Sequence, residues 1–398
     1  MDIKYYLRKA KDVHIHDVLS LFPMITALAM TPIFGKKFSK TWIVSERNDE
    51  ARDNGYHFFK YMRTYQKQQS CIYAIKKNSE DYKKVSALGK TVEYGSVMHW
   101  IMYFSAKYLI GSQNSMPNGY IATFFERLGV FHPNHVFLQH GITKDMAEFL
   151  LASHKKTKYF IAGALPEFIF MRDNFGYPEG TMQYTGFARF DALHDQNKLE
   201  RMILVMPTWR KWLWLKSEEH DDAKMDLDSS EYFNSWKCFL KDKRLEKIIE
   251  EQHVKVVFYP HPNMKKILDV EKLVSDNILI SDTDKDDLQE LLKSTSLLIT
   301  DYSSVFFDIA YMKKPSIFYQ FDEEKYRKYH YQQGWFDYHR TSFGKSCRKS
   351  EQVLDEIEKI IYNNFEVNDV FLEEHKRTFP LYDTNNSQRI YEILKTNS

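Results

Sequence analysis

Residues 297–319 are the part of this sequence that most restricts the possible fold. An apolar run at 297–299 leads into a polar turn at 300–304, and a segment with apolar residues at helical spacing follows. A second apolar run, at 316–319, comes directly after Pro315. This order predicts a buried strand, a turn, a helix and a second buried strand, which is the repeating unit of a parallel sheet.

The same alternation of apolar runs and helical patterns extends over most of the 398 residues. Further buried strands are predicted at residues 41–45, 70–75, 107–112, 134–139, 159–163 and 184–186, and then at 202–206, 254–259 and 277–280. Strands that alternate with helices form parallel sheets with helices on both faces. The sequence therefore predicts an α/β protein with two Rossmann-like, doubly wound domains that face a cleft.

The chain is too long for one domain of ordinary size, since single domains usually have about 100–200 residues. The apolar pattern is lost between Gly186 and Lys198, and we place the domain boundary there. The expected division is an N-terminal segment of residues 1–40, a first Rossmann-like domain of residues 41–195, and a second one of residues 196–398 that ends in helices.

The N-terminal segment contains a long apolar stretch, residues 18–30. Pro23 interrupts it, and it falls short of the ~18–20 uninterrupted apolar residues of a membrane-spanning helix. Cationic residues lie on both sides of the stretch, at the start of the chain and again at Lys36, Lys37 and Lys40. Two interpretations fit this pattern: a helix that lies in the surface of an anionic membrane, and a helix that packs against the first domain.

Composition and charge argue against some classes of function. The 56 Lys and Arg nearly balance the 54 Asp and Glu, so the net charge of +2 gives no reason to expect a nucleic-acid partner. The three cysteines have no C-x-x-C spacing, which argues against a structural zinc site. The acidic run at 282–287 precedes a predicted helix, where the helix dipole favours carboxylates, and we expect no metal site there.

Polar residues directly follow several of the predicted strands, at the sheet edge where parallel α/β proteins bind ligands. His140 follows the strand at 134–139 and precedes Gly141, which allows a substrate to approach closely. A histidine can take a proton from a hydroxyl at neutral pH, so His140 is a candidate general base. His261 lies between two prolines that hold its backbone, and it is a candidate donor to a phosphate oxygen; a turn with only a structural role is the alternative.

Two other strand ends provide a candidate phosphate site. Ser303 and Ser304 lie at a predicted helix start, where hydroxyls, free backbone N–H groups and the dipole favour an anion; a plain helix cap is the alternative. Arg210 ends the P-T-W-R turn and can pair with a phosphate through two N–H groups. Asp301 is anionic, so we expect it to cap the helix or to orient a neighbour such as His261 or a ribose hydroxyl.

Several of these motifs occur together in one protein family. The sequences QHGIT at 139–143, PTWR at 207–210, YPHP at 259–262 and LLITDYSSVFFDIAYMKKPSIFYQFD at 297–322 resemble the signature of the CDP-glycerol glycerophosphotransferases, the teichoic-acid and capsule polymerase family. The stretch WIVSERNDEARDNGYHFFKYMR at 42–63 resembles the N-terminal motif of the capsule and wall-polymer members. The motifs keep the family's order over residues 42–322.

The resemblance implies two domains in the glycosyltransferase-B arrangement. It implies an enzyme that transfers a polyol phosphate, in the first place glycerol phosphate, from CDP-glycerol or CDP-ribitol to an acceptor hydroxyl, with release of CMP and no obligatory cofactor. A lipid-linked or capsular polymer is the implied acceptor, and the implied location is peripheral, on the cytoplasmic face of the cell membrane. The first domain is then the acceptor side, and the second domain binds the CDP-linked donor.

Residue by residue, the two functionally important histidines of the family match His140 and His261, and its nucleotide phosphate site matches Ser303 and Ser304 with Asp301. To these we add, for the donor, Thr208, Arg210 and Pro262, and for the acceptor, the loop residues Arg47, Arg52 and Asn54. The sequence QGWFD at 333–337 departs from the family's R-G-Y-Y-F-D-like pattern, which leaves specificity in this region open.

Two other functions remain open at the level of sequence. Bacterial CMP-sialic-acid transferases of similar architecture also have H-P and S-S motifs, here at 261–262 and 303–304, but we find no counterpart of their acidic D/E-D/E-G motif. A catalytically inactive scaffold that docks on a membrane is the other alternative, and the intact polar strand ends argue against it.

Overall fold

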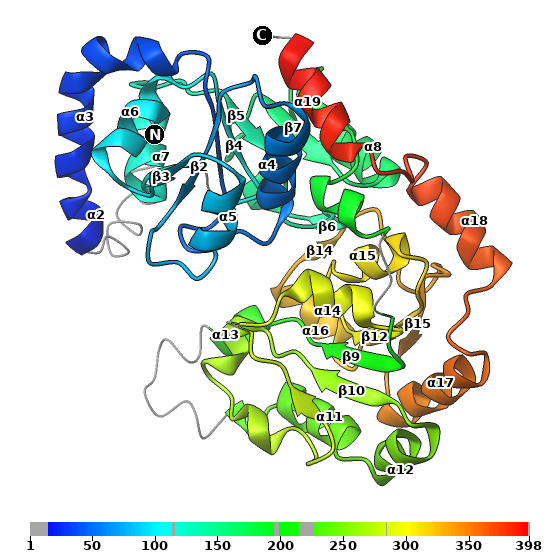
Figure 1. The fold of residues 1–398 in the computed structure, drawn as a ribbon. Coiled ribbons are helices and arrows are strands. Elements are labelled where there is room, and N and C mark those ends of the chain that lie inside the picture. Colours follow the sequence, from blue (N-terminus) through cyan, green and yellow to red (C-terminus); the bar gives the residue numbers. More distant parts are fainter. Residues whose placement is uncertain (1–14, 114–115, 195–198, 215–226, 284, 397–398) are drawn as a thin grey trace.

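The computed structural model describes residues 15–113, 116–194, 199–214, 227–283 and 285–396. Two parallel sheets form the frame of these residues (Figure 1). The predicted α/β class with two doubly wound sheets is confirmed. Residues 1–14 of the expected N-terminal segment lie outside the described residues.

The first sheet has seven parallel strands in the order β3-β2-β1-β4-β5-β7-β8. Alternate residues of a strand point to opposite faces, so Trp42 and Val44 join one hydrophobic cluster whereas Ile43 joins another. Both faces are therefore buried, which explains the continuously apolar strands. The bounds are β1 Trp42–Ser45, β2 Cys71–Ile75, β3 Thr91–Glu93, β4 Tyr108–Gly111, β5 His135–Phe137, β7 Tyr159–Ala162 and β8 Met182–Tyr184.

The second sheet has six parallel strands in the order β11-β10-β9-β12-β13-β15. Leu298 belongs to the same hydrophobic cluster as Trp42, whereas Ile299 faces a separate one. One hydrophobic core therefore continues from the first sheet to the second. The bounds are β9 Met202–Met206, β10 Lys255–Phe258, β11 Leu279–Ile280, β12 Leu297–Thr300, β13 Ser316–Tyr319 and β15 Gly344–Cys347.

Helices and short 3-10 turns connect the strands (Figure 1). In the first part of the chain these are α2 Ile15–Leu19, α3 Leu21–Phe34, η1 Gly35–Phe38, α4 Asn54–Tyr65, α5 Tyr82–Leu88, α6 Val97–Ser105, α7 Gly119–Arg127, η2 Glu148–Leu150, α8 Leu165–Asn174 and η3 Ala188–Ala192. In the second part they are α11 Glu231–Leu240, α12 Lys243–Gln252, α13 Pro262–Lys265, η5 Val270–Lys272, α14 Leu288–Ser294, α15 Phe306–Tyr311, α16 Glu323–Tyr329, α17 Ser350–Tyr362, α18 Asp369–Thr378 and α19 Asn386–Thr396.

The two parts of the chain are connected at several places. The last helix, α19, packs against α4 and η3 of the first part. A small antiparallel sheet pairs β6 (Asp145–Met146) with β14 (Gln332–Gln333). In the sequence, the strands of the first sheet precede the expected boundary at residues 195 and 196, and those of the second sheet follow it. The boundary itself is outside the described residues, so the domain division stays a prediction.

Three strands of the two large sheets differ from the apolar runs found in the sequence, and the two short strands β6 and β14 were not predicted either. β3 and β15 were not predicted, because they are edge strands with partly exposed polar residues and no apolar run. The strand expected at 277–280 is reduced to β11, a short edge strand whose side chains are exposed.

The N-terminal helices leave a large apolar surface uncovered. Met24 and Ala27 of α3 are buried in a cluster with residues of α6. The exposed side chains of α2 and α3 include Val18, Leu19, Phe22, Ile25 and Ile33, which are 54–78% exposed.

The helical segment Asp17–Phe38 has 22 residues, and by length and composition alone it is long and apolar enough to cross a membrane. Besides Pro23, the polar residues Ser20, Thr26 and Thr31 interrupt the apolar run of this segment. Their hydroxyls donate to backbone carbonyls of the preceding turn, which reduces their polarity.

We expect Gly186→Ala to destabilise the protein more than Gly180→Ala. Both glycines have a positive φ (76° and 80°), which costs an L-residue about 1–2 kcal/mol. A Cβ at Gly186 would also lie 1.8 Å from Asn386 Oδ1 at the start of α19, whereas a Cβ at Gly180 meets nothing within 4 Å. Denaturant unfolding should therefore give a further loss of about 1–3 kcal/mol for Gly186→Ala. Equal losses for the two variants would show that α19 does not pack closely on this turn.

Candidate functional site

A buried side chain fixes the turn that carries His140. Gln139 has a left-handed backbone (φ 59°), and its amide donates to the Ile161 carbonyl (2.7 Å) and to Glu167 Oε1 (3.0 Å). Thr143 Oγ1 donates to Gln139 Oε1 (2.8 Å). The turn therefore presents the His140 side chain, which is 68% exposed, beyond the end of β5.

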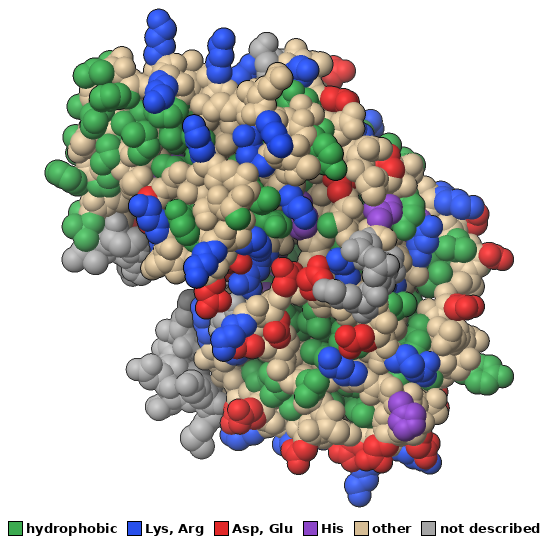
Figure 2. Space-filling model, viewed as in Figure 1, with side chains coloured by type: hydrophobic (Ala, Val, Ile, Leu, Met, Phe, Trp, Pro, Cys, Tyr) green, Lys and Arg blue, Asp and Glu red, His purple; other side chains and the backbone are tan. Residues whose placement is uncertain are grey.

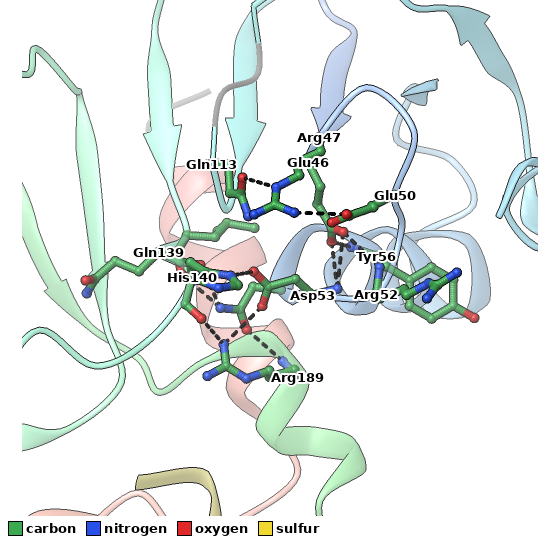
Figure 3. A network of polar contacts seen from close by, with 12 residues as sticks. Glu46, Arg47, Glu50, Arg52, Asp53, Tyr56, Gln113, Gln139, His140 and Arg189 are labelled. Carbon is green, nitrogen blue, oxygen red and sulfur yellow. Dashed lines mark hydrogen bonds and ion pairs between the residues drawn. The ribbon is translucent and has the colours of Figure 1, made fainter. Parts of the chain in front are cut away.

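Asp53 holds the His140 ring through its Nδ1 atom, at an Nδ1–Oδ2 distance of 2.7 Å (Figure 3). An ionised carboxylate only accepts, so Nδ1 carries a proton and Nε2 of the neutral ring has a free lone pair. Burial works to raise the pKa of Asp53, but the charges of His140 and Arg189 outweigh it and lower the pKa to about 2. Asp53 is therefore ionised at neutral pH and orients His140 as a proton acceptor.

Glu46 organises the loop that carries Asp53. Its buried carboxyl group accepts hydrogen bonds from the backbone N–H groups of Arg52 (2.8 Å), Asp53 (3.1 Å) and Tyr56 (2.6 Å) at the start of α4. Burial and the neighbouring Asp53 carboxylate nevertheless raise the pKa of Glu46 to about 8. Glu46 thus fixes the N-terminus of α4 and the position of Asp53.

Arg189 of η3 connects this group to the second sheet. Its Nε and Nη2 donate to the two carboxylate oxygens of Asp308 in α15 (2.7 and 2.9 Å). Its Nη1 donates to Asp53 Oδ1 and to the His140 carbonyl, both at 3.1 Å (Figure 3). One buried guanidinium therefore fixes Asp53, the backbone of His140 and the helix that follows the serine turn.

His261 follows β10 of the second sheet and is in the opposite hydrogen-bonding state to His140. The Asn263 backbone N–H donates to His261 Nδ1 (3.2 Å), so the proton of the neutral ring is on Nε2. Burial, followed by the charges of Arg47 and His140, lowers the pKa of His261 to about 4. His261 is therefore neutral at pH 7, and its ring lies within electrostatic reach of Arg47 and His140.

The turn that carries Ser303 and Ser304 meets the turn that carries His140. A Cβ atom at Gly141 would lie 2.8 Å from Ser304 Oγ, so this close approach requires glycine. The serines precede α15, which has only six residues and a correspondingly small dipole. An anion there would be held mainly by hydroxyls and backbone N–H groups, rather than by the helix dipole that the sequence pattern led us to expect.

Asp301 connects two strand ends. Its Oδ1 accepts from the backbone N–H groups of Thr208 (2.8 Å) and Tyr302 (2.6 Å), and its Oδ2 pairs with Arg210 Nη2 (2.8 Å). These contacts differ from the expected cap of α15 or orientation of His261, because the carboxylate is fully buried beneath the turn and not exposed beside it.

Arg210 is also fully buried. Its Nε and Nη2 donate to Asp322 (2.8 and 3.0 Å), and its Nη1 donates to the Thr208 carbonyl (2.8 Å). In this arrangement Arg210 supports the turn that carries Thr208. A direct contact between Arg210 and a donor phosphate stays a prediction, and it requires these pairs to open.

The three loop residues expected on the acceptor side lie in different environments. Asn54 is buried: its amide donates to the Gln139 carbonyl (2.8 Å), and its Oδ1 accepts from the Arg189 backbone N–H (3.1 Å). Arg52 pairs with Asp81 (2.9 Å). Arg47 is half-exposed and faces the cleft with His261, so it is the member of the three best placed to contact a substrate.

The described residues contain no group of three or more His, Cys, Asp or Glu side chains that could hold a metal ion. In the acidic run, Asp286 accepts from the Ser281 hydroxyl (2.6 Å) and Asp287 caps α14. Residue 284 of this run lies outside the described residues.

Three residues of the site were missed in the sequence: Glu46, Asp53 and Arg189. Glu46 and Asp53 are in a loop with six charged residues among ten, where nothing marks these two as buried. Arg189 lies where the apolar pattern ends, which we interpreted as a boundary. The signal that could have found it is an arginine in an otherwise apolar G-F-A-R-F stretch, because a cation there needs a buried partner.

Two doubly wound sheets with a histidine at the strand end of each define a protein of the glycosyltransferase-B type. The wall teichoic acid polymerase TagF has this fold: a solved TagF structure matches with a TM-score of 0.65 at 16% identity, over 98% of this chain and 97% of that one. The family model "CDP-Glycerol:Poly(glycerophosphate) glycerophosphotransferase" matches residues 27–396, so the chain belongs to this family.

Relatives of known role are longer than this chain. The minor teichoic acid biosynthesis protein GgaB of Bacillus subtilis is 31% identical over 372 residues, which are 91% of this chain and 40% of GgaB. The teichoic acid ribitol-phosphate polymerase TarK of Staphylococcus aureus is 27% identical over 247 residues, which are 56% of this chain and 42% of TarK. The chain thus spans less than half the length of these two relatives.

We expect His261 to titrate near pH 4 when its ring is followed by NMR. In the unfolded chain His261 has its ordinary pKa of 6.5. Between pH 6.5 and 4 the unfolded chain therefore holds a proton on His261 that the folded protein lacks. Stability should therefore fall as the pH falls through this window, and His261→Asn should reduce that slope. A midpoint near 6.5 in the folded protein would contradict the burial of this ring.

Proposed function

We propose that this protein transfers a polyol phosphate, most simply glycerol phosphate from CDP-glycerol, to an acceptor hydroxyl on a teichoic-acid-like or capsular polymer, and releases CMP. CDP-ribitol is the alternative donor. The observation that carries the proposal is a pair of histidines in opposite hydrogen-bonding states, His140 as acceptor and His261 as donor, each at a strand end of one of the two sheets. Family membership supports it, as does a solved TagF histidine-to-asparagine variant with CDPG.

His140 is the proposed general base. Its Nε2 takes the proton of the acceptor hydroxyl as the oxygen attacks the phosphorus next to the polyol, and the bond from that phosphorus to the CMP oxygen breaks. The imidazolium that forms is stabilised by ionised Asp53 at 2.7 Å. Arg189 holds Asp53 in place, so it is a positioning residue for the base.

The second sheet is the proposed donor side. The His261 Nε2–H and the hydroxyls of Ser303 and Ser304 donate to the diphosphate and to the leaving CMP. Thr208 and Pro262 belong to the adjoining turns, and buried Arg210 and Asp301 keep the Thr208 turn in position. Neutral His261 suits this role, since it donates a hydrogen bond without needing to be protonated.

The test is CMP release from CDP-glycerol, CDP-ribitol and CMP-sialic acid, each with a polyolphosphate or glycan acceptor. We expect acceptor-dependent CMP from one CDP-polyol. His140→Gln should lower kcat by about 10²–10⁴-fold, because positioned base catalysis contributes that much. Asp53→Asn should also lower kcat while the KM for the donor stays unchanged, because the ring loses its orientation.

His154→Gln is the matched control for this assay, because His154 is an exposed histidine in the loop before β7. Release from CMP-sialic acid alone would replace the proposal with a sialyltransferase. Donor binding without any turnover would favour the inactive scaffold.

We further propose that the α2–α3 surface docks on the cytoplasmic face of the cell membrane, where a lipid-linked acceptor would be reached. The exposed apolar side chains of these helices gather at one end of the molecule (Figure 2). Lys36, Lys37 and Lys40 follow directly and would attract anionic lipids.

Vesicle sedimentation tests this proposal. We expect binding to phosphatidylglycerol vesicles and much weaker binding to phosphatidylcholine, and at least a tenfold loss in Phe22→Glu and Ile25→Glu. Val370→Glu is the matched control, since Val370 is 64% exposed on α18. Full binding by the α3 variants would contradict the proposal, and resistance to alkaline extraction would indicate a spanning helix instead.

A further inference from the structure

A polar cavity of about 270 Å³ lies at the same end of the first sheet as the candidate base, and the mechanism proposed above places no ligand in it. Its lining residues follow β1 and β4, which are neighbours in the first sheet, and β3 at the edge of that sheet. They are Glu46, Arg47, Asn48, Asp49, Tyr94 and Gln113. His140 follows β5, the next strand in the sheet after β4, so the cavity and the base lie at the same edge.

The cavity lining carries almost no net charge to attract an anion. The Arg47 guanidinium already pairs with Glu50 through Nη1 (3.0 Å) and donates to Gln113 Oε1 through Nε (3.0 Å) (Figure 3). Asp49 adds a carboxylate. Glu46, whose pKa is raised to about 8 by burial and by Asp53, carries a proton at neutral pH. This differs from the serine turn, which has hydroxyls and no carboxylate directed outward.

The lining chemistry matches a ligand with many hydroxyl groups. The amides of Asn48 and Gln113 both donate to and accept from hydroxyls, the Asp49 carboxylate accepts from them, and an aromatic ring such as Tyr94 packs on C–H surfaces between them. The loop backbone is held rigidly, because the Asn48 and Asp49 carbonyls accept from Lys76 N (2.8 Å) and Ser79 Oγ (2.6 Å). A rigid, preformed polar loop lowers the cost of ordering on binding.

The size and position limit what can occupy the cavity. Ligand pockets usually measure about 300–1,000 Å³, so this one holds a single monomer unit and not a length of polymer. Arg47 lines it, and the charges of Arg47 and His140 both act on His261. A unit bound there therefore contacts Arg47, whose charge reaches His261, and lies at the edge of the sheet that carries His140.

We infer that this cavity binds the uncharged, polyhydroxylated terminal unit of the acceptor, a glycosyl or polyol residue, with Gln113, Asn48 and Asp49 as specificity-determining contacts. The inference rests on the proposed function, because only that function identifies the ligand as the acceptor. It adds a recognition site for the acceptor end to the first sheet, separate from the phosphate contacts of the second.

Ligand-observed NMR with glycerol, ribitol, methyl β-glucoside and glycerol 3-phosphate tests the inference. We expect at least one uncharged probe to bind better than glycerol 3-phosphate, and Gln113→Ala and Asn48→Ala to weaken it at least tenfold. Binding of the glucoside would identify a glycosyl end, and binding of glycerol or ribitol would identify a polyol end. Gln68→Ala is the matched control, because Gln68 is an exposed amide in the loop before β2, at the opposite edge of the sheet.

CDP-glycerol binding by the same variants separates this inference from the proposed function. We expect it to be unchanged in Gln113→Ala and Asn48→Ala. Three results would overturn the subsite. The variants could lose binding of the uncharged probe and of CDP-glycerol by the same factor. The wild-type protein could prefer glycerol 3-phosphate, or bind none of the uncharged probes. Wild-type protein that binds an uncharged probe but neither binds CDP-glycerol nor releases CMP would instead overturn the proposed reaction.

Discussion

Both sides of the candidate site depend on the buried guanidinium of Arg189. It pairs with Asp308 on the second sheet's helix α15 and with Asp53 on the first sheet's loop, and it also binds the His140 carbonyl. A buried carboxylate without a partner costs several kcal/mol, so neither carboxylate would keep its place if the arginine were removed. The relative position of the His140 turn and of α15, the helix after the serine turn, therefore depends on one side chain between them.

The protonation states of the two histidines follow from what each Nδ1 contacts. A carboxylate at His140 Nδ1 leaves Nε2 as an acceptor, and a backbone N–H at His261 Nδ1 makes Nε2 a donor. The surroundings reinforce this difference. Asp53 holds the His140 ring by its Nδ1 atom, whereas burial and the charges of Arg47 and His140 keep His261 neutral. One imidazole suits proton removal and the other suits hydrogen bonding to an anion.

Figure 2 shows the hollow between the two parts of the molecule, with charged side chains along both sides.

Much of the frame could be predicted from the sequence, because a strand buried on both faces must be apolar along its whole length. Residues 42–45, 202–206 and 297–300 show this, and each lies in the middle of its sheet. The short edge strands β3 and β15 are not buried on both faces, so they need no continuous apolar run and could not be recognised in the sequence. Strand ends also indicated His140, His261 and Ser304, since ligands gather at the carboxyl edge of a parallel sheet.

The partners of these residues could not be predicted in the same way. Asp53 and His140 are 87 positions apart, and Arg189 and Asp308 are 119 apart, and local periodicity carries no information about such pairs. The same limit explains why Arg210 was expected on a phosphate: its sequence context shows a cation after a strand but not the two carboxylates that bury it. The sequence by itself determined the secondary structure, the parallel sheets and the strand ends that carry polar groups, because these follow from hydrophobic periodicity along the chain. Only the tertiary structure decided which charges are paired, which histidine accepts and which donates, because these depend on contacts between distant segments.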